Sequence, residues 1–157
     1  MFITKKSIIG IIKLTGIIST ESRLGSRGGL NLNDLSDSIT KAFSFKNMKA
    51  IVLLVNSPGG SPVQSALIAN RIRDVAREKE IPVYCFIEDL AASGGYWLSC
   101  AADKIYAMES SIIGSIGVIT SGFGAVEAIK KIGIERRVYT QGKNKGLLDP
   151  FLPEKKD

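Results

Sequence analysis

The sequence contains no histidine, and this absence limits the chemistry that the chain can perform. A Ser-His-Asp triad drawn from this chain is excluded, so a serine nucleophile would need a different base. The two cysteines, Cys85 and Cys100, lie in separate apolar segments, which predicts buried free thiols rather than a disulfide framework. Without histidine or clustered cysteines the common zinc sites are excluded as well. We therefore expect no metal and no cofactor.

A long uninterrupted hydrophobic run is also missing. The longest apolar stretch, residues 8–18, contains Lys13 and is too short to span a bilayer. No signal peptide is recognisable at the N-terminus. We expect the chain itself to be soluble, with any membrane association made by a segment outside it.

A basic stripe of the kind that binds nucleic acid is absent too. The chain has 21 Lys and Arg against 15 Asp and Glu, a net charge of +6. The basic residues occur singly or in pairs without interleaved aromatic residues, so we expect a solvated basic surface and no nucleic-acid partner. The length of 157 residues predicts one domain, since a domain typically has roughly 100–200 residues.

What is present is an alternation of strand and helix patterns. Apolar, β-branched runs predict strands at residues 7–18, 50–55, 81–87, 104–108 and 136–140. Helical patterns predict a helix capped by Asn33, a second with Ser61 as N-cap and Pro62 as first residue, a short buried one at 96–102 and another at 124–132. Residues 19–31 are typical of an exposed loop. Repeated βα units predict an α/β fold with a mainly parallel sheet flanked by helices.

Two features of the packing follow from the same patterns. The run at 50–55 is entirely apolar, which predicts a strand buried on both faces. The helix after Ser61 is expected to bury a face that includes Val63, Leu67 and Ile72.

Two glycine-rich turns follow neighbouring strands, Ser57-Pro58-Gly59-Gly60 and Ala92-Ser93-Gly94-Gly95. In open α/β sheets ligands bind beyond the carboxyl ends of the strands, and glycines let backbone amides approach a ligand closely. A serine followed by glycine at the start of a helix combines a candidate nucleophile with a candidate oxyanion hole. Either turn alone is explained as a simple connection, whereas the pair favours an active site. Neither turn has a nucleotide-binding pattern.

Three segments resemble the hallmark motifs of the signal peptide peptidase A family: NSPGG at 56–60, AASGGY at 91–96 and GSIGV at 114–118. These enzymes are bacterial serine peptidases with a Clp-protease/crotonase-like fold of repeated ββα and βα units. The resemblance covers residues 8–145 and implies a Ser-Lys dyad. Ser93 then matches the nucleophile, the amides of Gly60 and Gly94 the oxyanion hole, Lys145 the general base, and Ser115 a residue whose hydroxyl contacts the lysine amine.

The resemblance also implies partners and a location. We expect peptide substrates such as residual signal peptides, a homo-oligomer, and a cytoplasmic or membrane-associated place in a bacterium. The chain departs from the family at Gly146, where an acidic residue commonly follows the lysine, and at Asp157, beyond which relatives continue with more helices. We therefore expect residues 1–157 to form a single peptidase domain that lacks those C-terminal helices.

Two alternatives stay open. A crotonase-like enzyme would use the same paired amides to hold an acyl-CoA thioester enolate, and would need an acidic catalytic residue, for which Glu88 and Asp89 are nearest in sequence. A catalytically incomplete oligomerisation scaffold would need no nucleophile at all. Lysine itself can act as a base only where burial lowers its pKa from the value near 10.4 that it has in water.

Overall fold

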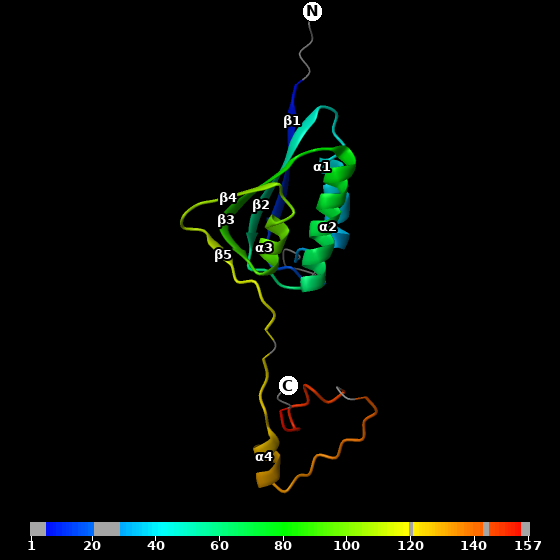
Figure 1. Ribbon diagram of the computed structural model, residues 1–157, viewed down its shortest axis with the longest axis vertical. Helices are drawn as coiled ribbons and strands as arrows, with labels where there is room; N and C mark the ends of the chain where they lie inside the picture. The colour runs from blue at the N-terminus through cyan, green and yellow to red at the C-terminus, as the bar shows by residue number, and fades with distance from the viewer. Residues whose placement is uncertain (1–5, 21–28, 120, 143–144, 155–157) are drawn as a thin grey trace, which may run out of the picture. The chain divides into compact units, whose positions relative to one another are not determined.

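A parallel β-sheet organises the N-terminal part of the chain (Figure 1). The protein is described by a computed structural model over residues 6–20, 29–119, 121–142 and 145–154. Part of the expected loop at 19–31, residues 21–28, lies outside this description. The chain divides into two compact units, Met1–Gly117 and Val118–Asp157. No helix in the described ranges is long and apolar enough to cross a membrane.

The sheet of the first unit has the strand order β1-β2-β3-β4, with β5 pairing with β3 beyond the end of β4. Every pairing between these strands is parallel, which confirms the expected α/β fold with a mainly parallel sheet. The strands are β1 (Ile8–Thr15), β2 (Met48–Ser57), β3 (Val83–Ala92), β4 (Lys104–Ala107) and β5 (Ile112–Gly114). Because all run the same way, β2 and β3 end at the same edge of the sheet, where both glycine-rich turns begin.

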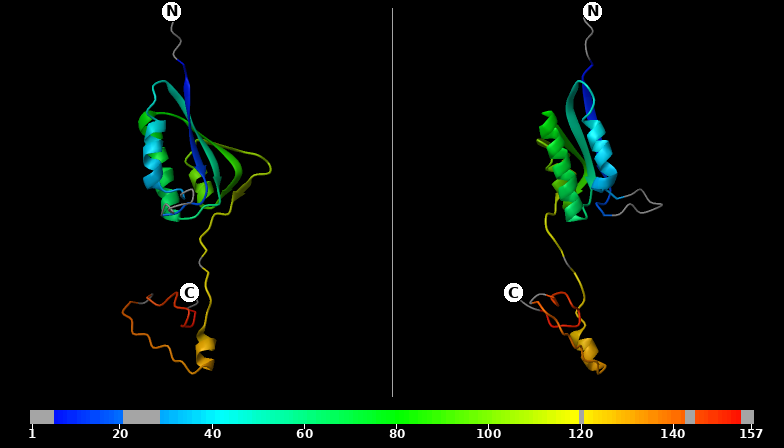
Figure 2. Two further views of the ribbon diagram at one scale, coloured as in Figure 1. Left: turned by 180° about the vertical axis from the view of Figure 1, so that it is seen from behind. Right: turned by 90° about the vertical axis from the view of Figure 1, so that its right-hand side faces the viewer.

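Three helices cover one face of this sheet: α1 (Leu32–Ala42), α2 (Pro62–Lys79) and α3 (Gly94–Ser99). Figure 2 shows α1 and α2 lying side by side next to the strands. The core lies between these helices and the sheet, and its fully buried members include Leu14, Ile39, Leu53, Ile68 and Cys85. Burial raises the pKa of the Cys85 thiol, so this cysteine stays protonated and acts as a small apolar side chain.

The expectation that the run at 50–55 is buried on both faces is wrong for one face. Ile51, Leu53 and Val55 point toward the helices and are fully buried, whereas Val52 and Leu54 are half-buried. Among the described residues of the first unit, no helix lies over the opposite face of the sheet. That face therefore exposes the apolar side chains Ile9, Ile11, Phe86 and Tyr106, of which the last two stack with ring centroids 5.0 Å apart.

Helix starts follow local hydrogen bonding. Ser61 caps α2 by accepting from the Gln64 amide, and Pro62 is the first helical residue, as predicted. The cap of α1 is Asn31 rather than the expected Asn33. Asn31 has the extended backbone that an N-cap requires, and its side chain accepts from the Asp34 amide, whereas Asn33 already lies inside the helix.

The buried face of α2 differs from the expected one. Its core residues repeat at the helical period and are Ser65, Ile68, Ala69, Ile72, Val75 and Ala76. Val63 is 64% exposed and Leu67 is 42% exposed, because both lie on the neighbouring, outward side of the helix. The short helix α3 likewise buries Leu98 but leaves Trp97 exposed, and Cys100, which follows it, is exposed as well, so the predicted burial of Cys100 is wrong.

The second unit contains one short helix among its described residues, α4 (Val126–Lys131), inside the range where a helix was expected. Ala125 donates a backbone hydrogen bond to the carbonyl of Pro150, and Arg136 forms an ion pair with Asp149 at 2.8 Å. The expected strand at 136–140 is not formed. A strand needs a neighbouring strand for its backbone hydrogen bonds, and no described segment of this unit supplies one.

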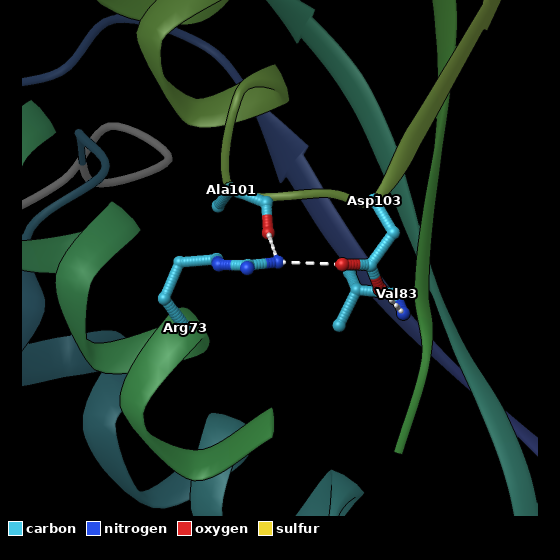
Figure 3. Close-up of polar contacts among 4 residues, drawn as sticks. All are labelled: Arg73, Val83, Ala101 and Asp103. Atoms are coloured by element: carbon cyan, nitrogen blue, oxygen red, sulfur yellow. Dashed lines mark hydrogen bonds and ion pairs between the residues drawn. The ribbon is translucent and has the colours of Figure 1, made fainter. Parts of the chain in front are cut away.

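Helix α2 is tied to the sheet by an ionic contact near the amino end of β3 (Figure 3). Arg73 donates to a carboxylate oxygen of Asp103 at 2.8 Å and to the Ala101 carbonyl at 3.3 Å. The other oxygen of Asp103 accepts from the Val83 amide at 2.8 Å. These bonds, the Val83 amide first and Arg73 next, hold the pKa of Asp103 below its usual value of 3.8.

We predict that Asp103→Asn lowers the free energy of unfolding by about 1 kcal/mol near neutral pH, a modest value because the ion pair is partly solvated. A carboxylate with a lowered folded-state pKa stabilises the protein above its unfolded value and loses that effect as pH falls through the folded value. The difference between wild type and variant should therefore shrink below about pH 3.8. Urea unfolding across pH measures it, and the exposed Asp74→Asn on α2 is the control. A difference that is constant down to about pH 2 would contradict this role.

Candidate active site

Ser93 lies at the turn between β3 and α3, as the sequence predicted. Its backbone has φ +52° and ψ −119°, a conformation that a non-glycine residue adopts only when its surroundings impose it. The Ser93 amide donates to the Gly114 carbonyl at 2.7 Å, and its carbonyl accepts from the Trp97 amide at 3.0 Å. The side chain makes no capping bond to the helix and is half-buried, so the hydroxyl is available for another partner.

The second glycine-rich turn packs directly on this one. Gly59 has φ +93°, and a Cβ placed there would lie 2.7 Å from the Ala92 carbonyl oxygen and from the Gly94 nitrogen. A Cβ at Gly94 would overlap the hydroxyl oxygen of Ser65. Glycine is therefore required at both positions by close contact. The two turns are separated in the sequence by one helix and one strand, yet they form a single structure.

Two backbone N–H groups at these packed turns, those of Gly60 and Gly94, are available to a ligand. Gly60, with φ +143°, is held through its neighbours: the Ile18 amide donates to the Gly59 carbonyl at 2.9 Å, and the Ile18 carbonyl accepts from the Ser61 amide at 2.8 Å. Neither the Gly60 amide nor the Gly94 amide donates a hydrogen bond to any group in the described part of the chain. Backbone N–H groups without partners near a serine are the arrangement that can bind a negatively charged oxygen.

Ser57 has a role in this site that sequence reasoning missed. Its side chain is fully buried, donates to the Gly16 carbonyl at 2.7 Å and accepts from the Gly59 amide at 3.2 Å. It thus joins the end of β1 to the turn that lies against Ser93. A serine before Pro-Gly-Gly was the available signal, and such a serine is equally typical of an ordinary turn.

Ser115 follows β5, and Lys145 belongs to the second unit. The pairing of Ala92 with Gly114 and the hydrogen bond from Ser93 to Gly114 bring the backbone next to Ser115 alongside Ser93. Ser115 is exposed and, like Ser93, has φ +52°. Lys145 is exposed, and its amide donates to the Gly142 carbonyl at 3.3 Å.

The first unit therefore brings together four of the five predicted site residues: Ser93, Gly60, Gly94 and, through its backbone neighbour, Ser115. Lys145 is described only within its own unit. Its place in the site stays a prediction.

Acidic and metal-binding side chains are scarce near Ser93 in the described part of the chain. No group of three or more potential metal ligands occurs among the described residues. The acidic residues nearest in sequence to Ser93, Glu88 and Asp89, are exposed. Asp89 accepts a hydrogen bond at 2.8 Å from the side chain of Asn56, across the two strands that lead into the turns.

These features define a class: an α/β protein with a serine at a strained strand-to-helix turn beside unpaired amides, the arrangement of serine hydrolases. A family model described as Peptidase family S49 matches residues 75–157. The chain belongs to peptidase family S49, which confirms the resemblance to the signal peptide peptidase A family.

Curated relatives match nearly the whole chain. A putative signal peptide peptidase SppA of Enterococcus faecium is 38% identical over 94% of this chain and 42% of its own length. A chloroplastic serine protease SPPA of Arabidopsis thaliana is 34% identical over 93% and 22%. A Brucella melitensis protein named Na(+)/H(+) antiporter NhaA is 51% identical over 94% and 20%. The chain thus spans between a fifth and about two fifths of these relatives.

A solved structure supports the fold. A mutant of the 1510-N membrane-bound stomatin-specific protease superposes with a TM-score of 0.52 at 21% identity, covering 68% of this chain and 46% of that one. The expected Clp-protease/crotonase-like fold is therefore confirmed.

Replacing Ser57 tests whether its two hydrogen bonds hold the turn at Gly59. We predict that Ser57→Ala lowers the free energy of unfolding by about 1–3 kcal/mol, because it removes two hydrogen bonds of a buried hydroxyl. Amide hydrogen exchange at Gly59 should accelerate. The control is Ser99→Ala, which truncates another fully buried serine, one whose hydroxyl donates to the Gly95 carbonyl within α3. Equal exchange at Gly59 in the two variants would show that Ser57 does not hold this turn.

Proposed function

We propose that this chain carries the active site of a serine endopeptidase with a Ser-Lys dyad. Ser93 is the nucleophile, and the amides of Gly60 and Gly94 bind the oxyanion. Lys145 is the general base, and Ser115 orients its amine. The observation that carries the proposal is the contact between the two glycine turns, which sets two unpaired amides beside a serine whose hydroxyl caps nothing. Membership of peptidase family S49 supports the reaction class.

Each step of the reaction has a residue for it. The Ser93 oxygen attacks the carbonyl carbon of the peptide while the neutral Lys145 amine takes the hydroxyl proton. The carbonyl oxygen becomes an oxyanion and accepts hydrogen bonds from Gly60 and Gly94. The carbon–nitrogen bond then breaks, and the leaving amine takes the proton from Lys145. Water, deprotonated by the same lysine, then attacks the acyl carbon. The ester bond to the Ser93 oxygen breaks, that oxygen takes the proton back from Lys145, and the carboxyl product leaves.

Because the chain has no histidine, we propose a lysine as the base. The surroundings of Lys145 must then keep its amine neutral. A neutral lysine near physiological pH needs a pKa lowered by burial. Lys145 is exposed within its own unit, so the proposal requires that assembly of the enzyme buries its amine beside Ser93. We propose that both units belong to one peptidase domain and that the active form is a homo-oligomer. The dyad then comes from one subunit or from two neighbours.

The proposed substrates are peptides, including residual signal peptides, in keeping with the name of the Enterococcus faecium relative. The antiporter name belongs to a protein of which this chain matches one fifth. The match covers nearly all of a chain that belongs to family S49, so we propose no transport for it.

We predict that Ser93→Ala abolishes labelling by a fluorophosphonate probe and lowers peptide hydrolysis by about 10⁴-fold or more, because no other group can form the acyl intermediate. Folding should be unchanged, since one half-buried oxygen is removed. Ser38→Ala, at an exposed position on α1, is the matched control and should label normally. An unlabelled wild-type protein would favour the crotonase-like or the scaffold alternative instead.

We predict that Lys145→Arg is as inactive as Lys145→Ala, because arginine keeps the positive charge but cannot give up its proton near neutrality. Lys143→Arg, two positions away and outside the described residues, is the control and should retain turnover. The measurement is kcat of the assembled protein as a function of pH. If a lysine is the base, kcat should rise with pH as the fraction of neutral lysine increases. A merely electrostatic role predicts that arginine substitutes tolerably and that alanine mainly raises KM; that result would remove Lys145 from the dyad.

A further inference from the structure

Strand β3 has a local excess of residues over its neighbour β2 just before the candidate active site. The two strands pair residue for residue up to Val55 and Ile87, and the next pair is Ser57 with Ala91. One residue of β2 therefore lies opposite three residues of β3, 88–90, which we call the β3 bulge. Bulges bend the strand that carries them, and next to active sites they change the direction of a side chain.

This bulge decides which residues of the two strands meet at the active site. In an uninterrupted register Asp89 would lie opposite Ser57, and Ser93 would lie about 7 Å further along, the length of two strand residues. The bulge instead brings Ser93 level with the second turn, where a Cβ placed at Gly59 would lie 3.0 Å from the Cβ of Ser93. The approach of the serine to the Gly60 amide therefore depends on the bulge.

The other side of β3 depends on the same bulge. β4 pairs with β3 before it and β5 pairs with β3 after it, so the two short strands follow one another along β3 (Figure 1). β5 ends at Gly114, whose carbonyl accepts from the Ser93 amide at 2.7 Å. The bulge is thus the point at which β5 replaces β4, and β5 supplies the hydrogen bond that fixes the backbone of Ser93.

Two side chains from outside β3 hold the bulge, one on each side. Asn56, the β2 residue opposite the bulge, donates from its side chain to the Asp89 carboxylate at 2.8 Å. Ser111, in the connection between β4 and β5, donates its hydroxyl to the Glu88 carbonyl at 2.6 Å. The same hydroxyl accepts from the Met108 amide at 3.2 Å, which fixes its direction. Both bonds join neighbouring strands to the part of β3 where regular pairing is interrupted.

We propose that Asn56 and Ser111 are positioning residues of the Ser93 site. They fix the β3 bulge, and the bulge sets the distance between the Ser93 hydroxyl and the oxyanion amides. The role assigned to them rests on the proposed peptidase reaction, in which Ser93 is the nucleophile. A displacement of about 1 Å at a reacting group can cost about 10²-fold in rate, so two hydrogen bonds that add little to stability are expected to control turnover.

The test reverses the hydrogen bond between Asn56 and Asp89 in the full chain. Asn56→Asp sets two carboxylates against each other and breaks the bond. Combining Asn56→Asp with Asp89→Asn restores the bond with donor and acceptor exchanged, and it leaves the net charge as in the wild type. Asn70→Asp, at an exposed position on α2, is the control for added charge. The measurements are kcat, KM, the rate of fluorophosphonate labelling and, by NMR, hydrogen exchange of the Ser93 amide.

Asn56→Asp is expected to lower kcat and the labelling rate at least about tenfold while KM changes less than about twofold. The double variant should return to within about threefold of the wild type, because the pair is coupled. Exchange of the Ser93 amide should accelerate in the single variant and slow again in the double one. Ser111→Ala should lower kcat in the same way, with the exposed Ser110→Ala as its control.

The proposal is overturned if Asn56→Asp turns over as fast as Asn70→Asp, or if the double variant does not recover. A purely structural role predicts unfolding at lower urea concentration with labelling of the folded protein at the wild-type rate, and that result overturns it as well. An unlabelled wild type would contradict the peptidase reaction itself. Exchange of the Ser93 amide then decides the positioning role alone: acceleration in the single variant with recovery in the double variant supports it, and unchanged exchange overturns it.

Discussion

The contact between two backbone turns is the constraint on which the candidate active site depends. Gly59 lies so close to the turn at Ser93 and Gly94 that a Cβ placed there would lie 2.7 Å from both the Ala92 carbonyl oxygen and the Gly94 nitrogen. Ser57 fixes one of the turns to the end of β1, and the Gly114 carbonyl fixes the other to β5. The strain of a positive φ at Ser93 persists because this packing leaves the residue no other conformation.

The same parallel sheet separates two kinds of chemistry along its length. The carboxyl ends of β2 and β3 carry the glycine turns, whose free amides suit a developing negative charge. Near the amino end of β3, by contrast, Arg73 already forms an ion pair with Asp103 at 2.8 Å. Between the two ends the core is apolar and fully buried, so the strands act as a rigid spacer.

The local chemistry of the sequence was sufficient for some elements and insufficient for others. The start of α2 was predicted correctly because Ser61 and Pro62 specify a helix terminus by themselves. The cap of α1 was misplaced by two residues because Asn31 and Asn33 are chemically identical, and only the backbone around them distinguishes the cap. The strand expected at 136–140 failed for a different reason, since a segment with β-branched and aromatic residues becomes a strand only where another strand is available to pair with it.

Residue patterns by themselves determined the parallel α/β fold, the order of its elements as far as β4 and the two turns that carry Ser93, Gly60 and Gly94, since periodicity and glycine placement are local properties of a chain. The absence of histidine likewise determined that any base must be another residue. Only the tertiary structure decided that Ser57 joins β1 to the Gly59 turn and that Cys100 and Leu67 face outward. Each of these depends on which distant segments come together, because burial and hydrogen-bond partners are set by the packing of elements and not by the residues next in sequence.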